Sequence, residues 1–272
     1  MLSLLEMFDY AFMQKAFIIG GLLGIIIPFV GVVSVLRRLS MTGDALSHSS
    51  LAGVAIGLVA GLNPVYISII VCVLSAFAIE FFRRKMPQYS EMSVAIVMSL
   101  GVGTAGVMSG FVKSGSSFQS FLFGSILAVT DFEFWLVVGV SFAVILLSIL
   151  LYKELMHVTF DENSAKLAGI PVNRVNFIFT ILNALTVAAA SRTVGTLVVS
   201  SMMVLPVAVA MQFSKSYKHT VILSCICGVA FIYGGLVSSY LWDFKPGGSI
   251  ALIGVIALVI SFIIKAGFKK KI

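Results

Sequence analysis

The chain has 272 residues, of which 60% are hydrophobic and only 11% are charged, and its mean hydropathy is +1.12. A soluble domain carries about a quarter charged residues, so this composition excludes an ordinary soluble protein. The net charge is +7, and the positions of the basic residues decide what that excess means.

Apolar segments follow one another along the whole chain, and nine of them are candidates for helical spans of a hydrocarbon core about 30 Å thick. The sixth and ninth are short, so eight or ten spans remain open alternatives. Segment 118–129 is apolar but too short to cross, and we expect it in the interface or as a re-entrant helix. The nine expected spans are 12–36, 45–62, 64–82, 92–112, 132–152, 175–190, 194–213, 221–241 and 250–264.

The basic residues fix the expected orientation. Fourteen of the eighteen follow the first, third, fifth, seventh and ninth spans. Because loops rich in Lys and Arg stay in the cytoplasm, we expect a multi-pass protein of the cell membrane with its N-terminus outside and its C-terminus in the cytoplasm. Trp135 and Trp242 then fall near the outer interface, as an aromatic belt requires. The positive charge thus reflects orientation and contact with anionic lipid, and it needs no nucleic-acid partner.

The most informative polar segment is 41–57, MTGDALSHSSLAGVAIG. Asp44 and His48 are four residues apart and share one face of a helix, where a carboxylate and an imidazole can together bind a divalent transition-metal ion. Asp44 could instead be the N-cap of the second span, and His48 could hydrogen-bond within the bundle. A polar side chain within a span costs roughly 2–3 kcal/mol at mid-depth, which favours a functional reason for the pair.

A second polar segment, 159–172 (TFDENSAKLAGIPV), lies in the longest expected cytoplasmic loop. Asp161 and Glu162 begin it, Ala165 follows, and Gly169 ends it before Pro171. Acidic residues at the start and a Gly–x–Pro stop predict a short helix. It is either a solvated loop helix or a docking helix for a cytoplasmic partner.

Segment 43–53, GDALSHSSLAG, resembles the permease subunits of ABC importers for divalent zinc, manganese or iron, the ABC-3 family. The resemblance continues in order at 122–129 (LFGSILAV), 160–171 (FDENSAKLAGIP) and 194–206 (VGTLVVSSMMVLP), and it covers essentially the whole chain. One departure is that Ser49–Ser50–Leu51–Ala52 replaces the usual apolar-Leu-Pro before Gly53. The missing proline leaves this helix less kinked than in the family.

The resemblance implies an all-α membrane helix bundle of eight to nine transmembrane helices, similar to permeases of the vitamin B12/siderophore type, forming a single transmembrane permease domain over residues 1–272. It implies a homodimer that binds a cytoplasmic ABC ATPase and receives metal from an extracytoplasmic metal-binding protein. By their places in the family motifs, Asp44 and His48 match the metal-contact pair. The residues that match the family's ATPase-coupling helix are Asp161, Glu162, Ala165 and Gly169.

The function expected from these features is translocation of divalent zinc, manganese or iron, driven by ATP that the partner hydrolyses. The chain is not expected to be an enzyme or to hold a cofactor, because it has no phosphate-binding loop with a lysine. The alternative is a gradient-driven secondary transporter of metal or another small solute. Such proteins carry several buried carboxylates near the midplane, whereas here Asp44 is the one candidate. The sequence leaves the choice among the three metals open.

Overall fold

Long, apolar α-helices make up nearly all of the computed structural model, which describes residues 10–112, 122, 124, 129–242 and 244–269. Among these residues the regular structure is helical throughout, and eight helices are long and apolar enough to cross a membrane. This confirms the expected membrane helix bundle. The eight are α1 (Ala11–Leu36), α3 (Pro64–Lys85), α4 (Ser90–Ser109), α6 (Asp131–Leu150), α9 (Val172–Thr193), α10 (Thr196–Phe213), α11 (Tyr217–Trp242) and α12 (Pro246–Lys269).

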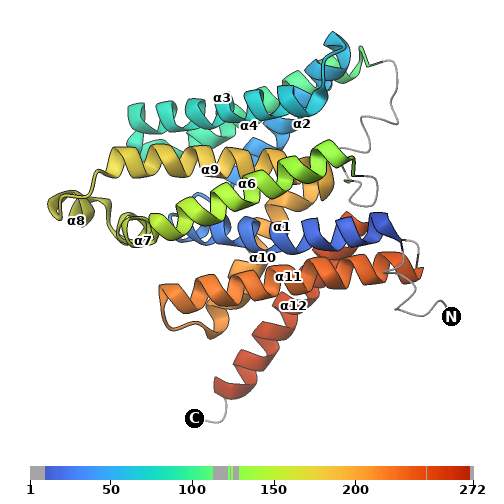
Figure 1. Ribbon diagram of the computed structural model, residues 1–272. Helices are drawn as coiled ribbons and strands as arrows, with labels where there is room; N and C mark the ends of the chain where they lie inside the picture. Colours follow the sequence, from blue (N-terminus) through green and yellow to red (C-terminus); the bar gives the residue numbers. More distant parts are fainter. Residues whose placement is uncertain (1–9, 113–121, 123, 125–128, 243, 270–272) are drawn as a thin grey trace.

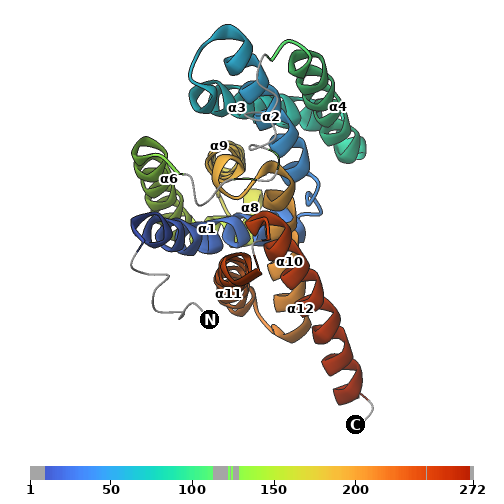
Figure 2. The ribbon, with the colours of Figure 1, turned by 90° about the vertical axis from the view of Figure 1, so that its right-hand side faces the viewer.

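The remaining long helix, α2 (Thr42–Ala60), corresponds to the second expected span. It has 19 residues, but Asp44, His48 and its serines keep it out of the apolar group. It packs against α3, α4, α9 and α10, and Figure 2 shows it running obliquely between the α3–α4 pair and α10. A helix with protein on so many sides can keep polar side chains that lipid would not tolerate.

Close approach of helix backbones holds the bundle together where α1 crosses α11. A Cβ atom added to Gly24 would lie 2.8 Å from the Cα of Val229, and one added to Gly228 would meet the carbonyl oxygen of Gly24 and lie 2.5 Å from Cγ of Pro28. Helices in lipid gain their association largely from such close packing of small residues. The two glycines therefore set the distance between α1 and α11.

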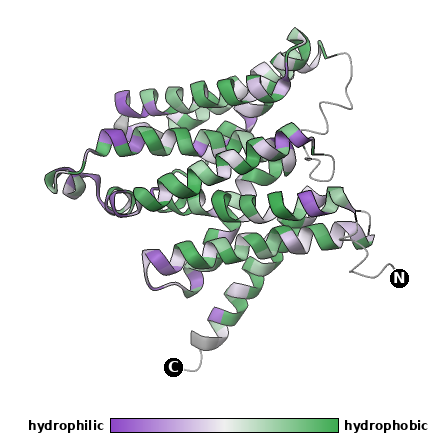
Figure 3. Cartoon of the chain, viewed as in Figure 1, coloured by the Kyte–Doolittle hydropathy of each residue, from purple (hydrophilic) through white to green (hydrophobic). Residues whose placement is uncertain are grey.

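The two ends of the bundle differ in polarity (Figure 3). One end collects the C-terminal ends of α1 and α3, the α10–α11 connection and two short helices, α7 (Tyr152–Phe160) and α8 (Glu162–Leu167), and α8 projects furthest (Figure 1). The opposite end carries the start of α6 with Trp135 and the end of α11 with Trp242. Of the segment expected to be interfacial or re-entrant, 118–129, only residues 122, 124 and 129 lie within the described part of the chain.

Candidate functional site

Asp44 and His48 both lie in the first half of α2, on a helix that is otherwise mostly buried. The helix begins at Thr42 after Met41 as its N-cap, so Asp44 stands in the first turn and is not the capping residue. Twelve residues of α2 are buried, whereas Asp44 and His48 are each partly exposed. The structure therefore brings the pair together on one helix face, as the spacing of four predicts.

The neighbours of α2 identify the face on which the pair lies. Gly43 faces α10, because a Cβ there would lie 2.5 Å from Sδ of Met203. α4 packs against the backbone of His48 and Ser49, since a Cβ on Gly101 would lie 2.9 Å from the Ser49 nitrogen. Successive helix positions turn by about 100°, which places the Asp44 side chain between these two neighbours. The pair thus occupies the side of α2 left partly uncovered between α10 and α4.

The pair offers one carboxylate and one imidazole, a donor set that suits divalent transition metals. Within the described part of the chain, no three His, Cys, Asp or Glu side chains gather where they could hold a metal ion together. Two ligands leave most of the coordination sphere to other groups. That arrangement suits brief contact with a passing ion, because a complete cage would retain it.

Serine hydroxyls hold the middle of α2 in place, a feature that motif reasoning missed. Ser50 Oγ is hydrogen-bonded to Ser68 Oγ of α3 at 2.7 Å and to Ser191 Oγ of α9 at 2.6 Å. Ser49 Oγ donates to its own helix, to the carbonyl of Ala45 at 2.8 Å. In the sequence, the two serines that directly follow His48 could have indicated these hydrogen bonds. The two bonds of Ser50 fix α2 against α3 and α9 just after His48.

The predicted short helix in the long loop is present as α8, with Asp161 as its N-cap. Asp161 accepts hydrogen bonds from the Asn163 nitrogen at 2.9 Å and from Ser164 Oγ at 2.5 Å. The Ser164 bond, together with the backbone bonds, lowers the pKa of the Asp161 carboxyl. Gly169 ends the segment with a φ of +80°, a left-handed conformation that glycine adopts without strain.

The faces of α8 are unequal. Ala165 is buried within the chain's own hydrophobic core, so it packs α8 onto the bundle and is not available to another protein. Leu167, by contrast, is 90% exposed. Leu167 lies at the end of the bundle opposite the tryptophans, on the side of α8 that faces away from the core.

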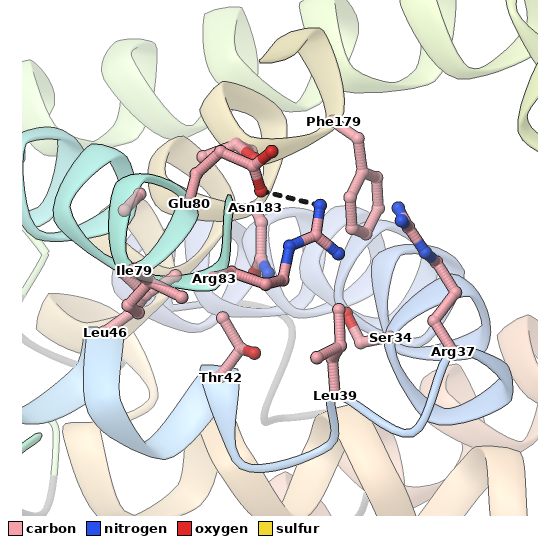
Figure 4. A pocket seen from close by; sticks show the side chains of 12 residues that line it. Ser34, Arg37, Leu39, Thr42, Leu46, Ile79, Glu80, Arg83, Phe179 and Asn183 are labelled. Atoms are coloured by element: carbon pink, nitrogen blue, oxygen red, sulfur yellow. Dashed lines mark ion pairs between the residues drawn. The ribbon is translucent and has the colours of Figure 1, made fainter. Parts of the chain in front are cut away.

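Figure 4 shows a cavity toward which Arg37, the C-cap of α1, and Arg83 of α3 point. Arg83 pairs with Glu80 at 2.7 Å within α3, and the Phe179 ring lies between Arg83 and Arg37 (Figure 4). A second and larger cavity of about 550 Å³ also has Arg37 and Arg83 in its lining, and it opens between the α1–α2 loop, the end of α3 and α8. Arg37 forms an ion pair with Glu162, so Glu162 is turned toward the bundle.

The cavity drawn in Figure 4 is smaller, about 30 Å³, and lies between α1, α2, α3 and α9. Its lining includes buried oxygens that have no hydrogen-bonding partner among the described protein residues: Ser34 Oγ, Thr42 Oγ1 and Asn183 Oδ1. A space of this size holds one or two water molecules, which could bond such oxygens. Thr42 and Leu46 line the cavity, whereas Asp44 lies between them in sequence and so faces the other side of α2.

The chain is similar to known membrane transport proteins over nearly its whole length. The model of the ABC 3 transport family matches residues 9–265. A probable metal transport system membrane protein of Treponema pallidum is 35% identical over 256 residues, covering 93% of this chain and 96% of the relative. The manganese import system permease protein ScaB of Streptococcus gordonii is 30% identical over 256 residues, covering 94% of this chain and 92% of that protein.

Among solved structures, PsaBC from Streptococcus pneumoniae in complex with Fab contains a similar chain. The two share 31% sequence identity and superpose with a TM-score of 0.84, covering 96% of this chain and 95% of the other. The likeness therefore extends to the arrangement of the helices over nearly the full length.

Proposed function

The chain belongs to the ABC 3 transport family, and on that premise we propose that it is the translocating subunit of an ATP-driven importer of divalent transition-metal ions. The observation that carries the proposal is the Asp44–His48 pair on the partly uncovered side of an otherwise buried helix. Carboxylate and imidazole ligands accept Mn²⁺, Zn²⁺ and Fe²⁺. Two of the relatives are named for manganese import or transport, which supports Mn²⁺ as the first cargo to test.

The working unit in this proposal is a homodimer. One chain supplies two of the four to six ligands that these ions take, and a second copy facing the same pathway would supply the same pair again. Water molecules complete the coordination as the ion passes. This supports transient binding of modest strength, which an importer needs in order to release its cargo.

The energy source in this proposal is a separate cytoplasmic ABC ATPase that docks on α8. The exposed Leu167 offers an apolar contact on the outer face of that helix, and Asp161 fixes its first turn. An extracytoplasmic metal-binding protein would deliver the ion at the opposite end, where Trp135 and Trp242 lie. The chain then sits in the cell membrane with its C-terminus in the cytoplasm.

The proposal is tested by measuring ⁵⁴Mn²⁺ uptake in cells that lack their own manganese importers and express this chain with its ATPase and binding protein. We expect Asp44→Ala and His48→Ala each to reduce uptake at least about tenfold, since each removes half of the ligand set, an effect of about 1.4 kcal/mol or more. Inhibition of ⁵⁴Mn²⁺ uptake by added Zn²⁺ or Fe²⁺ ranks the three metals by how well each competes for transport.

Ser49→Ala is the matched control. Ser49 follows His48 directly and is buried, and its side-chain bond goes to the Ala45 carbonyl of its own helix. Alanine therefore leaves no group of another helix without this bond and favours the helix, so uptake should stay within about twofold of wild type. Wild-type uptake in both Asp44→Ala and His48→Ala would remove the pair from the transport path. Uptake that survives ATP depletion but stops when the proton gradient collapses would instead support a gradient-driven transporter.

A further inference from the structure

Glu162 of α8 faces the bundle and is held there by side chains from two long helices. Arg37 Nη2 forms an ion pair with Glu162 Oε1, and Arg37 Nη1 donates to Asn176 Oδ1 at 2.9 Å. Asn176 Nδ2 donates to the same Glu162 oxygen at 3.0 Å. These three residues, the Arg37 network, join α8 to the C-terminal end of α1 and to the first turns of α9.

This network is the polar connection between α8 and the long helices. Among the residues that the structure describes, the side-chain hydrogen bonds that leave α8 for other helices all pass through Glu162. The bonds of Asp161 stay within the first turn of α8. Ala165 adds apolar packing. A displacement of α8 therefore acts on α1 and α9 through the carboxylate of Glu162.

Arg37 lies directly before the loop that leads into α2. That loop is short and internally bonded: the Leu39 nitrogen donates to the Ser34 carbonyl at 2.8 Å, and the Thr42 nitrogen donates to the Leu39 carbonyl at 3.0 Å. Arg38 within it has a φ of +59°, a conformation that the surroundings must enforce in a residue other than glycine. A loop constrained in this way moves together with its ends, and Asp44 stands two residues beyond Thr42.

Burial ties Arg37 to its partners. Its side chain is 7% exposed, while that of Glu162 is 39% exposed. Burial lowers the pKa of Arg37, as does the nearby positive charge of Arg83, and the carboxylates of Glu162 and Glu80 oppose both effects. A buried guanidinium is costly to leave without its carboxylate, so the end of α1 follows Glu162 when α8 moves.

We propose that Glu162 and Arg37 are positioning residues that transmit movement of α8 to the α1–α2 connection and so to the helix that carries Asp44 and His48. The inference rests on the proposed function, because it takes α8 as the docking site of the ATPase. It assigns the two faces of α8 different tasks: the outer face with Leu167 contacts the ATPase, and the inner face with Glu162 connects to the transport helices.

The test uses the full complex of this chain, its ATPase and its binding protein in proteoliposomes, with Mn²⁺ uptake and ATP hydrolysis measured in parallel. For Glu162→Ala we expect the complex to assemble and hydrolyse ATP, while the number of Mn²⁺ ions transported per ATP falls at least about fivefold, the lower end of measured couplings between sites. Glu162→Gln, which keeps a hydrogen-bond acceptor but not the charge, should fall between Glu162→Ala and wild type.

Glu80→Ala is the matched control. It removes a carboxylate whose charge also acts on Arg37 but whose bonded partners, Arg83 and Arg84, lie on its own helix, so it leaves the bonds of the Arg37 network in place. The ratio of transport to hydrolysis should therefore stay near that of wild type. Leu167→Ala is the second comparison, and it should weaken co-purification of the ATPase instead of changing the ratio.

The outcomes separate this inference from the proposed function. If the wild-type complex transports Mn²⁺ and Glu162→Ala keeps the wild-type ratio, the link through Glu162 is wrong and the proposed function stands. A ratio that falls equally in Glu80→Ala, or a loss of uptake and hydrolysis in proportion with a lower melting temperature, indicates a merely structural role and also overturns it. If the wild-type chain neither binds the ATPase nor transports metal, the proposed function itself fails.

Discussion

At the scale of single residues, an ion pair at the end of the bundle opposite α8 combines two tasks in one side chain. Glu133 Oε1 accepts from Arg192 Nε at 2.6 Å, and the two side chains are 8% and 19% exposed. The other carboxylate oxygen of Glu133 accepts from the Thr130 nitrogen at 2.9 Å, which completes a capping box at the start of α6. One carboxylate thus begins α6 and joins it to the end of α9.

We predict that Glu133→Ala strongly destabilises the chain. The substitution breaks a charge-assisted hydrogen bond to the partly buried Arg192, which is worth about 1.5–3 kcal/mol, and loss of the cap adds about 1 kcal/mol. The measurement is thermal unfolding in detergent, with the intact complex monitored by size exclusion. Glu133→Gln separates the two tasks, because an amide oxygen can still accept from Thr130 but carries no charge. If Glu133→Ala unfolds at the wild-type temperature, the pair contributes nothing to stability.

Residue spacing alone predicted the parts of the site that are local in sequence. Asp44 and His48 are four apart, and the start and stop signals of α8 lie within nine residues, so periodicity and capping rules reach them. The Arg37 network lies beyond such rules, because Arg37 is 139 residues from Asn176 and 125 from Glu162. In the sequence, Arg37 is a basic residue after an apolar span, and it therefore indicated only the orientation of the chain. The burial of Arg37 and its bonding partners depend on how α1, α8 and α9 pack.

At the scale of helices, the sequence predicted the order and nearly every position of the spans, but it drew two of them too short at both ends. The spans expected at 175–190 and 250–264 are α9 (Val172–Thr193) and α12 (Pro246–Lys269). Ser191 stands just beyond the expected end at 190, and a polar residue ends a hydropathy pattern. It is buried and hydrogen-bonded to Ser50 of α2 at 2.6 Å, so the helix continues through it. Hydropathy measures lipid exposure, and this turn faces protein.

The crossing of α1 and α11 yields a prediction at this scale. We expect Gly228→Ala to destabilise the folded chain by about 1–3 kcal/mol, the usual cost of overpacking, because the added methyl group meets the Gly24 carbonyl and the ring of Pro28. The two helices would have to separate to admit it. The fraction of chain that elutes as a monodisperse species, together with its melting temperature, measures the effect.

Gly139→Ala in α6 is the control for this crossing. Nothing lies within 4 Å of a Cβ built at Gly139, and alanine favours a helix over glycine. Its stability should equal that of wild type or exceed it slightly. Equal stability of the Gly228 and Gly139 variants would mean that α1 and α11 can part without cost, contrary to the close packing proposed for them.

At the scale of the whole molecule, polarity and shape give the same division of the bundle into two ends. The end with α7 and α8 also receives the end of α3 with Arg83, Arg84 and Lys85, and the basic α10–α11 connection (Figure 1). The other end has Trp135 and Trp242, both largely exposed, as side chains of an interfacial aromatic belt would be. Sequence order alone predicted this alternation, since each span reverses the direction of the chain. The burial of α2 and its central place among α3, α4, α9 and α10 could not be predicted from the sequence.

This division predicts that the C-terminus and α8 lie in the cytoplasm. Each Lys or Arg near an anionic cytoplasmic leaflet contributes about 1 kcal/mol, and fourteen of the eighteen lie at this end by chain order. Green fluorescent protein fused after residue 272 or inserted after Lys215 should fluoresce, and alkaline phosphatase at the same places should be inactive. At Gly61, between α2 and α3, the two reporters should give the opposite result. An active phosphatase after residue 272 would place α8 outside, where no cytoplasmic ATPase could reach Leu167 or displace Glu162. The import mechanism would then fail together with the orientation, because both require α8 and the ATP supply to be on the same side of the membrane.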